Sequence, residues 1–410
     1  MTLPDRATRE RGEAPIALLG LLALMTSVVA LTIDAVLPAL DAMSADLAFT
    51  AENDRHAVIF AVFAGLALAQ VVVGPVADAI GRRRTVMVGY AVYLGGTLLC
   101  FLAWNPEALL AGRFLQGAGA AAPRVVAVTI VRDLYSGRPM ARILSLVNTI
   151  FMAVPMLAPL VGQGLELAGG WRAIFAFYMA AAAISLVWYL AAIPETLAPE
   201  NRRPLALRPL AAALMEVLRT RQALLCTAIT SAVFGSFTAY LATSQQIFEE
   251  LYGLGALFPA AFALLAGAFA VTSFLNGRLV MRFGMRRLSG AALWLMTGAA
   301  ALGTALAAAM AGMPPLWLLL LLLSTVFMAV ALVFANMIAL ATEPLGHVAG
   351  TATSVALAAS TLGASALGAL IASFYDGSVT PLFAGFTALG VLALLLFRGL
   401  PRDTTAESPR

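Results

Sequence analysis

Long runs of apolar residues alternate along the chain with short segments rich in arginine, glycine and proline. Each run holds about 20 or more residues, the length of a helix that crosses a bilayer, whereas the strands of a membrane barrel are about half as long and alternate in polarity. The pattern therefore predicts an all-α membrane protein with twelve spanning helices. They are expected near residues 15–40, 56–79, 85–104, 108–131, 142–167, 171–193, 221–248, 255–280, 286–311, 314–341, 346–373 and 378–399.

The longest polar segment, 194–220, separates the first six predicted helices from the last six. It contains acidic, basic and proline residues, which are typical of a connecting segment. We therefore expect an N-terminal six-helix half over 1–193, a cytoplasmic linker over 194–220 and a C-terminal six-helix half over 221–410. Two fused halves of this kind are a known plan of membrane transporters.

The composition excludes a soluble globular protein. Hydrophobic residues make up 61% of the chain and charged residues only 11%, whereas about 25% of the residues in a soluble domain are charged. The net charge of +4 does not indicate a nucleic-acid-binding surface, because the arginines form short clusters between the apolar runs. Arg6, Arg9 and Arg11 precede the first apolar run, and no short apolar core with a cleavage site follows them, so this run is predicted to be a retained span.

The positions of the arginines predict the orientation in the membrane. All 25 basic residues are arginines. A cytoplasmic N-terminus would place most of them on the cytoplasmic side, as in membrane proteins generally, and would leave Arg55 and Arg172 on the other side. We therefore expect a multi-pass protein of the bacterial inner membrane with both termini in the cytoplasm.

One acidic residue, Asp34, lies deep in the first predicted helix. A carboxylate inside a membrane is costly unless it is protonated or paired. Asp34 is therefore a candidate proton carrier and a candidate partner for a cationic substrate. The alternative is an aspartate at the membrane interface that ends the helix before Pro38.

Arg113 begins a polar stripe in the fourth predicted helix, and Gln116 follows one turn later. A guanidinium does not readily lose its proton, so a buried Arg113 must meet an anion, carbonyl groups or water, and it could hold Asp34 ionised. Gln116 is a candidate cavity residue. The alternative is that Arg113 extends to the membrane surface as an anchor.

Arg124 follows eleven residues after Arg113. At this spacing the two side chains project from one face of a helix, about 16 Å apart. Lipid cannot accommodate such a stripe, so Arg124 is expected to face the central cavity or another helix. The alternative is that Arg124 pairs with Asp133 or Asp78.

The second half contains no acidic residue deep in a predicted helix. Its candidate cavity residues are Phe237, Tyr240 and Asn336. Aromatic surface with neutral hydrogen-bonding groups suits an amphiphilic substrate. The alternative for each aromatic residue is ordinary packing between helices.

The segment between the second and third predicted helices resembles the signature loop of the major facilitator superfamily. The resemblance rests on Gly74, Asp78, Gly81, Arg82 and Arg83. Ala79 departs from it, because the family often has a basic residue at this position.

Other stretches are similar to Bcr/CflA-type drug–proton antiporters. They are 34–40, 113–120 with 131–135, 349–354, and a helix motif with Pro155, Pro159 and Gly162. Gln163 departs from the last motif, which usually has a second glycine there. These stretches follow the family order over nearly the whole chain.

The resemblance implies a major facilitator fold of twelve helices and proton-coupled efflux of a drug or small metabolite. It implies that Asp34 and Arg113 take part in proton coupling and that the loop motif forms a cytoplasmic gate. The expected partners are a small amphiphilic molecule, protons and the lipid bilayer. We expect a monomer that uses the proton gradient and needs no cofactor.

Two other functions stay open at this point. One is proton-coupled import of an organic anion that binds Arg113 and Arg124, and the other is a membrane receptor or scaffold without transport. The sequence contains no phosphate-binding loop, no cysteine and histidine spacing of a metal site and no nucleophile motif, so we predict no enzyme and no metal site.

Overall fold

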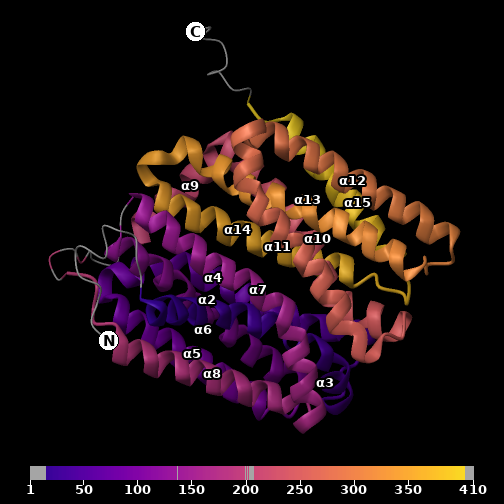
Figure 1. Ribbon diagram of the computed structural model, residues 1–410, viewed down its shortest axis with the longest axis horizontal. Helices are drawn as coiled ribbons and strands as arrows, with labels where there is room; N and C mark the ends of the chain where they lie inside the picture. The colour runs from indigo at the N-terminus through magenta and orange to yellow at the C-terminus, as the bar shows by residue number, and fades with distance from the viewer. Residues whose placement is uncertain (1–14, 136, 199, 201, 203–206, 402–410) are drawn as a thin grey trace, which may run out of the picture.

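The computed structural model describes residues 15–135, 137–198, 200, 202 and 207–401, and this part of the chain is helical without a strand (Figure 1). Arg6, Arg9 and Arg11 lie outside the described residues. The first group of helices comprises α2 (Ile16–Asp34), α3 (Leu40–Asp46), α4 (Ala57–Ile80), α5 (Arg82–Phe101), α6 (Pro106–Leu134), α7 (Gly137–Gly169) and α8 (Trp171–Ala192), with short turns η1 (Leu37–Ala39) and η2 (Glu52–His56).

The second group follows a connecting helix, α9 (Leu207–Arg219). It comprises α10 (Arg221–Gln245), α11 (Phe258–Phe283), α12 (Met285–Ala309), α13 (Leu316–Thr342), α14 (Ala349–Ala372) and α15 (Thr380–Arg398), with turns η4 (Gln246–Leu251), η5 (Gly255–Leu257) and η6 (Glu343–Val348). Figure 1 shows the two groups on opposite sides of the molecule. The pairs α4 with α14 and α7 with α11 pack against each other where the groups meet.

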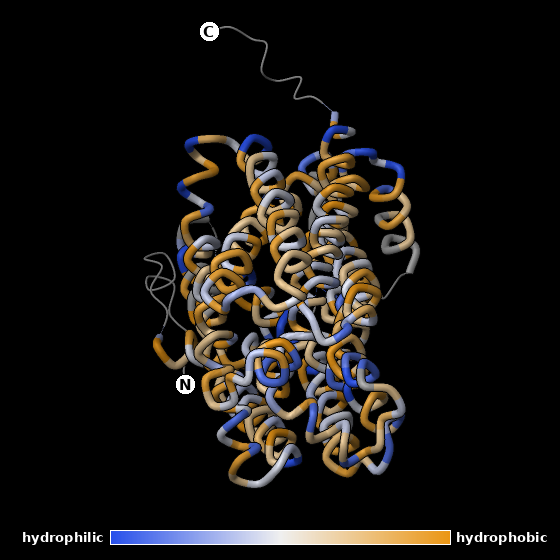
Figure 2. The backbone as a smooth tube through the Cα atoms, turned by 90° about the vertical axis from the view of Figure 1, so that its right-hand side faces the viewer, coloured by the Kyte–Doolittle hydropathy of each residue, from blue (hydrophilic) through white to orange (hydrophobic). Residues whose placement is uncertain are grey.

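Eleven helical segments in the described part of the chain are long and apolar enough to cross a membrane. The remaining predicted span, 142–167, falls within α7, which has 33 residues and packs against α2 and α11. Figure 2 shows hydrophobic residues along most of the helices and hydrophilic residues mainly at the turns. This distribution is that of a multi-pass membrane protein.

The first predicted span needs a correction. We expected one helix over 15–40, but α2 ends at Asp34, Pro38 lies in the turn η1, and α3 continues to Asp46. Proline has no backbone N–H to donate and its ring clashes with the preceding turn of a helix. The break therefore comes just before Pro38, and it places Asp34 at the end of a helix inside the protein.

Glycines let neighbouring helices approach closely. A Cβ on Gly65 would lie 2.0 Å from the Phe114 carbonyl oxygen, and a Cβ on Gly117 would lie 2.0 Å from the Val62 carbonyl oxygen. The backbones of α4 and α6 therefore touch at two levels. Because lipid is as apolar as a leucine side chain, such close backbone packing is a main source of helix association in membranes.

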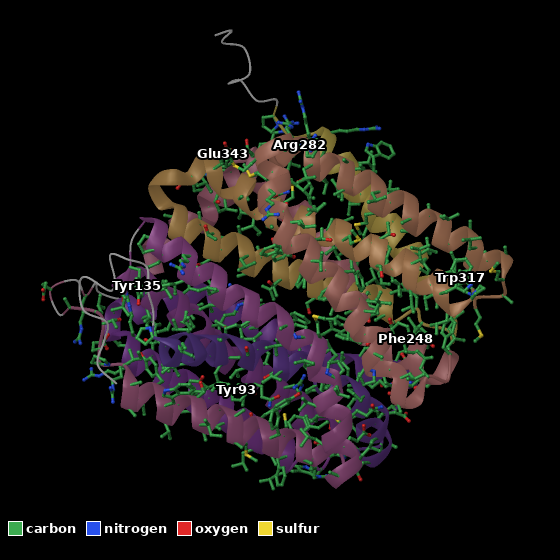
Figure 3. The ribbon with its side chains drawn as sticks, viewed as in Figure 1. Tyr93, Tyr135, Phe248, Arg282, Trp317 and Glu343 are labelled. Carbon is green, nitrogen blue, oxygen red and sulfur yellow. The ribbon has the colours of Figure 1, made fainter. Side chains whose placement is uncertain are left out.

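The two ends of the helix bundle differ in how the groups meet. We call the end formed by 37–56, 246–257 and 373–379 the closed end, and the end formed by 78–84, 132–135, 193–198 and 283–286 the motif end. Figure 3 labels Phe248 and Trp317 toward the closed end and Tyr135, Arg282 and Glu343 toward the motif end.

Polar contacts join the two groups at the closed end. Arg55, only 3% exposed, forms an ion pair with Glu250 at 2.8 Å, and its guanidinium also binds Asp41 at 3.0 Å. His56 Nε2 lies 2.5 Å from Gln246 Oε1. Further bonds run from Asn53 to the Ser373 and Tyr375 carbonyls and from Gln163 to the Gly255 carbonyl. The closed end is therefore sealed by side chains of both groups.

Replacing Arg55 with glutamine should loosen this seal, because it leaves the carboxylates of Glu250 and Asp41 without this cation. The reporter is Ser365→Cys, at a buried position in α14 that faces a cleft between α4 and α14. The two native cysteines, Cys100 and Cys226, are buried. We expect labelling of the reporter by a membrane-impermeant maleimide to become about tenfold faster, a shift of about 1.4 kcal/mol in the opening equilibrium.

Arg172→Gln is the matched control for this experiment. Arg172 forms an ion pair with Asp46 at 2.7 Å at the same end, but both residues belong to the first group. Its loss should leave the labelling rate of the reporter unchanged. Equal rates in the Arg55 and Arg172 variants would show that the Arg55 contacts do not hold the closed end shut.

Candidate transport site

Asp34 is buried, with 5% of its surface exposed. Among the described residues, its carboxylate has no hydrogen bond and no ion pair. Asp34 is the last residue of α2, as the alternative interpretation predicted. It lies in the protein interior, however, and not at the membrane interface. A buried carboxylate without a partner is most stable when it carries a proton.

Arg113 is completely buried and its guanidinium is satisfied by neutral oxygens. It donates to the Val58 carbonyl at 3.1 Å, to the Thr32 carbonyl at 2.9 Å and to Gln116 Oε1 at 2.9 Å. It therefore connects α6 with α2 and α4. Of the two sequence-based interpretations, the structure agrees with a buried arginine among carbonyl groups and not with an arginine that extends to the surface.

The structure does not pair Arg113 with Asp34. Arg113 reaches the backbone of Thr32, two residues before the aspartate. The expectation that Arg113 holds Asp34 ionised through an ion pair is therefore corrected. Two tyrosines lie beside these groups: Tyr178 donates to the Leu31 carbonyl at 2.8 Å, and the Tyr93 hydroxyl lies 2.6 Å from Thr32 Oγ1.

These tyrosines were not singled out from the sequence. Tyr93 and Tyr178 are both buried, in the spans α5 and α8. The hydroxyl of a buried tyrosine usually has a hydrogen-bonding partner, so a tyrosine inside a predicted span is a signal of polar surroundings. This signal could have placed both residues near the arginine stripe.

Gln116 is completely buried beside Arg113. Its amide nitrogen donates to Thr97 Oγ1 at 2.9 Å, and its oxygen accepts from Arg113. With these partners Gln116 positions the guanidinium of Arg113. The sequence-based hypothesis expected Gln116 on the surface of a cavity. In the structure it is instead completely buried and bound to Arg113.

Arg124 lies deeper in α6 and has different surroundings. Its side chain is partly exposed, and its guanidinium carbon lies 5.8 Å from the centre of the Phe151 ring of α7. The expected alternative, a pair with Asp78 or Asp133, is wrong for this structure, because both carboxylates bind Arg82 at 2.6 Å and 3.2 Å. No hydrogen bond or ion pair joins Arg124 to any other residue that the structure describes.

The second group contributes an aromatic cluster. The Phe237 ring lies 5.4–5.6 Å, between centroids, from the rings of Phe234, Phe269 and Phe327. The Tyr240 ring lies 4.7 Å from Phe327. The Tyr240 hydroxyl is buried and has no hydrogen-bonding partner among the described residues.

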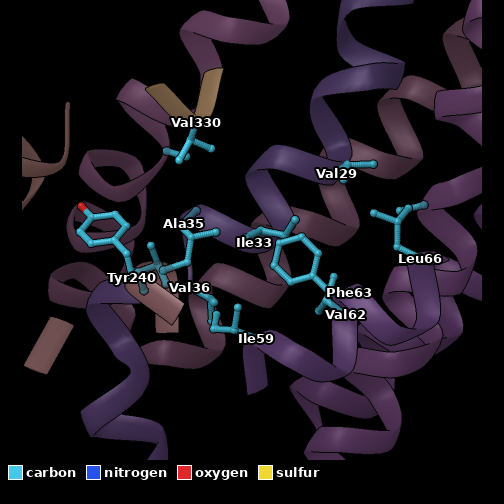
Figure 4. Close-up of a cluster of buried hydrophobic side chains, with 14 of the residues drawn as sticks. Val29, Ile33, Ala35, Val36, Ile59, Val62, Phe63, Leu66, Tyr240 and Val330 are labelled. Atoms are coloured by element: carbon cyan, nitrogen blue, oxygen red, sulfur yellow. The ribbon is translucent and has the colours of Figure 1, made fainter. Parts of the chain in front are cut away.

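This cluster reaches the first group. Figure 4 shows Tyr240 together with Ile33, Phe63 and Val330, which come from α2, α4 and α13. Phe63 also packs edge-to-face on Phe234, with ring centres 6.1 Å apart. The aromatic residues of α10 therefore lie next to the end of α2 that carries Asp34.

Asn336 of α13 is buried and pairs with Asn276 of α11. Each amide donates to the oxygen of the other, at 3.1 Å and 3.2 Å. One donor and part of the acceptor capacity of each amide stay available, since an amide group can make about four hydrogen bonds. Asn336 is thus held in one orientation by a partner that the sequence did not assign to it.

The loop motif forms a compact polar network at the motif end. Gly81 separates α4 from α5 with φ +96°, a conformation that favours glycine, and a Cβ there would lie 2.4 Å from Glu195. Arg82 binds Asp78 and Asp133, as given above, and the backbone N–H groups of Arg82 and Arg83 donate to the Glu195 carboxylate at 2.9 Å and 3.1 Å. A Cβ on Gly74 would meet nothing within 4 Å, so close packing does not explain this glycine.

Glu195 completes this network and was not predicted. Partial burial opposes its ionisation, but three backbone N–H groups donate to it and Arg202 adds a favourable charge, so the pKa of Glu195 is lowered from its ordinary value. The negative carboxylate at the start of α5 also suits the positive end of the helix. All these partners belong to the first group and its connection, so among the described residues the motif forms no hydrogen bond or ion pair with the second group.

The helix motif lies in α7, with Pro155 and Pro159 inside the helix. Gly162 packs directly on the end of α2, since a Cβ there would lie 1.8 Å from the Ala35 carbonyl oxygen. The motif therefore contacts the residue that follows Asp34.

A cleft between α4 and α14 lies away from these groups. It has a volume of about 570 Å³ and runs between α4 and α14 near the closed end, with His56, Ala61 and Ser365 in its lining. Asp34, Arg113 and Arg124 do not line it. The candidate site is therefore defined by its buried polar side chains and not by this cleft.

The chain matches the model of the family described as the Major Facilitator Superfamily over residues 22–367. The chain belongs to the major facilitator superfamily. The predicted family and fold are confirmed, and the protein is a membrane transporter of small molecules and not an enzyme.

Curated relatives cover much of the chain. It is 26% identical to a protein of Bacillus subtilis named as an uncharacterized MFS-type transporter, YdgK, over 97% of this chain and 98% of that protein. It is 28% identical to a bicyclomycin resistance protein homolog of Haemophilus influenzae, over 89% of this chain and 91% of that protein. It is 34% identical to the multidrug resistance protein MdtL of Salmonella heidelberg, over 59% of this chain and 61% of that protein.

Solved structures share the fold. A D-xylose–proton symporter matches with a TM-score of 0.73 and 15% identity, over 96% of this chain and 99% of that one. The human organic anion transporter MFSD10 matches with a TM-score of 0.62 and 19% identity, over 94% of this chain and all of that one. At these identities the similarity shows the fold alone.

Proposed function

We propose that this transporter exports amphiphilic small molecules, drugs among them, in exchange for protons. The names of the resistance proteins among its relatives support export. The observation that carries the proposal is Asp34, a buried carboxylate without a hydrogen bond or ion pair to any described residue, in the neighbourhood of the aromatic residues of α10. Such a carboxylate can hold a proton when the site is empty and release it when a cationic or polar group of a substrate binds nearby.

Arg113 has a positioning role in this mechanism. Its three hydrogen bonds hold α2, α4 and α6 in a fixed relation around the Asp34 end of α2. The aromatic cluster of Phe237 and Tyr240 offers apolar surface for the body of the substrate, and the Asn276–Asn336 pair offers neutral hydrogen bonds. A substrate of this kind needs a mainly apolar site with a few fixed polar groups.

The two halves, 1–193 and 221–410, would rock against each other around this site, with the linker 194–220 between them. We place the protein in the bacterial inner membrane as a monomer, with both termini in the cytoplasm. The arginine clusters favour this orientation. It puts the closed end in the periplasm, so the structure corresponds to a state that is shut toward the outside.

Import of an anion through Arg113 and Arg124 together has less support. Each nitrogen of the completely buried Arg113 guanidinium already donates to an oxygen of the protein. Arg124, in contrast, has no hydrogen bond to a described residue. A receptor or scaffold does not need a buried acid beside an aromatic cluster. Neither alternative accounts for Asp34 as directly as proton exchange does.

Everted membrane vesicles test the proposal. Respiration makes their interior acidic, so a proton-coupled exporter should concentrate amphiphilic cations such as ethidium and release protons when the substrate is added. We expect uptake that depends on this protein and collapses when an uncoupler is added. A broad panel of amphiphiles that gives no proton release, together with uptake of organic anions by whole cells, would contradict export.

A further inference from the structure

Arg124 faces the interior of the first group. Arg113 marks the interior face of α6, because it is completely buried, whereas Phe114 and Leu115 are partly exposed on the outer surface. Eleven residues correspond to three turns plus about 20°, so Arg124 projects from nearly the same face as Arg113. The helices α2, α4, α5 and α7 pack around α6. The partly exposed side chain of Arg124 therefore adjoins interior space and not lipid.

The two arginines of this face differ in what they bind. Every group of the Arg113 guanidinium donates to an oxygen of the protein. Arg124 has no hydrogen bond or ion pair with a described residue, and its guanidinium lies over the ring of Phe151. A guanidinium over an aromatic ring keeps its N–H groups free in its own plane.

Protein carboxylates do not neutralise Arg124 in this state. Asp78 and Asp133 bind Arg82, and Glu195 accepts from backbone N–H groups at the motif end. Asp34 is buried and has no ion pair with a described residue. A cation within a membrane protein is costly without an anion, and the described residues supply none.

We propose that Arg124 is the binding site for an anionic group of the substrate, a carboxylate or sulfonate on an aromatic amphiphile. The planar fork of the guanidinium can donate two parallel hydrogen bonds to such a group, and Phe151 offers apolar surface beside it. The inference refines the substrate class and rests on the proposed export function. It also places the anion site at Arg124, since each nitrogen of the completely buried Arg113 guanidinium already donates to an oxygen of the protein.

Two dyes that differ by one charge test this site. Rhodamine B carries a free carboxylate, and its methyl ester has the same aromatic cation without it. Binding of each dye to the purified full-length protein in lipid nanodiscs is measured by fluorescence polarisation, which does not require transport. We expect wild-type protein to bind rhodamine B about tenfold more tightly than the ester.

Three variants accompany the wild type. Arg124→Gln should remove the preference for the carboxylate and leave the affinity for the ester within about twofold. Arg124→Lys should retain much of the preference, because it keeps the charge. Arg84→Gln is the matched control: it removes the same charge from an exposed position at the motif end and should change neither affinity.

The outcomes separate the two proposals. A preference that follows Arg124 supports the anion site, and it does so even if everted vesicles accumulate neither dye, in which case the export proposal fails alone. Equal affinities of wild type for the two dyes, a preference that survives Arg124→Gln, or no saturable binding of rhodamine B would each overturn the anion site.

Discussion

Replacing Asp34 with asparagine will abolish proton coupling, so that substrate addition to everted vesicles no longer releases protons above the level of vesicles without the protein. The amide has nearly the same shape as the carboxylic acid but cannot exchange a proton. Because the Asp34 carboxylate has no bond to another described residue, the substitution breaks no ion pair and the protein should fold normally. Proton release is followed with a pH-sensitive dye, and folding with the melting temperature of the purified protein.

Asp46→Asn provides the control for Asp34→Asn. Asp46 lies at the closed end, twelve residues later at the end of α3, and it binds Arg172 at 2.7 Å. The change removes one carboxylate of the same type from a position outside the site, and coupling should persist. If the Asp34 variant still releases protons as the wild type does, another group carries the proton and our assignment of Asp34 is wrong.

Replacing Gly162 with valine should destabilise the protein strongly. A Cβ at this position would lie 1.8 Å from the Ala35 carbonyl oxygen, and this oxygen belongs to backbone that cannot rotate away. Overpacking of a closely packed interior typically costs about 1–3 kcal/mol. The result would be a clear loss of thermal stability, measured by size-exclusion chromatography of the fluorescently tagged protein after heating, together with loss of transport.

Gly164→Val is the matched control on the same helix. Gly164 is exposed, and a Cβ there would meet nothing within 4 Å. Valine at this position should therefore retain the stability and activity of the wild type. Equal stability of the two variants would show that α7 does not pack on the end of α2 as closely as described here.

Much of the fold could be predicted from the sequence, because a membrane restricts which residues can lie at each depth along its normal. A helix must be long enough to cross the apolar layer, and charged residues must stay near its surfaces. Both conditions concern residues that are close together in the sequence, so the sequence alone is enough to recognise the spans. Where prediction failed, as with the single helix expected over 15–40, a proline made the helix end earlier.

The candidate site was predicted only in part. The periodicity of an α-helix predicts Arg113 and Arg124 on one face of α6, since that relation depends only on the spacing along the helix. It could not show that Arg113 binds the backbone of α2 and α4, nor that Glu195 accepts from the N–H groups that begin α5. Such contacts join residues far apart in sequence.

The sequence by itself therefore determined the membrane spans, the polar connections between them and the identity of the charged residues within them. Tertiary structure alone determined which of those charges have partners. Each nitrogen of Arg113 donates to a carbonyl or amide oxygen, whereas Asp34 and Arg124 lack hydrogen bonds and ion pairs with the described residues. The reason is physical: spacing along one helix sets the direction of a side chain, but its partners depend on how neighbouring helices pack against that face.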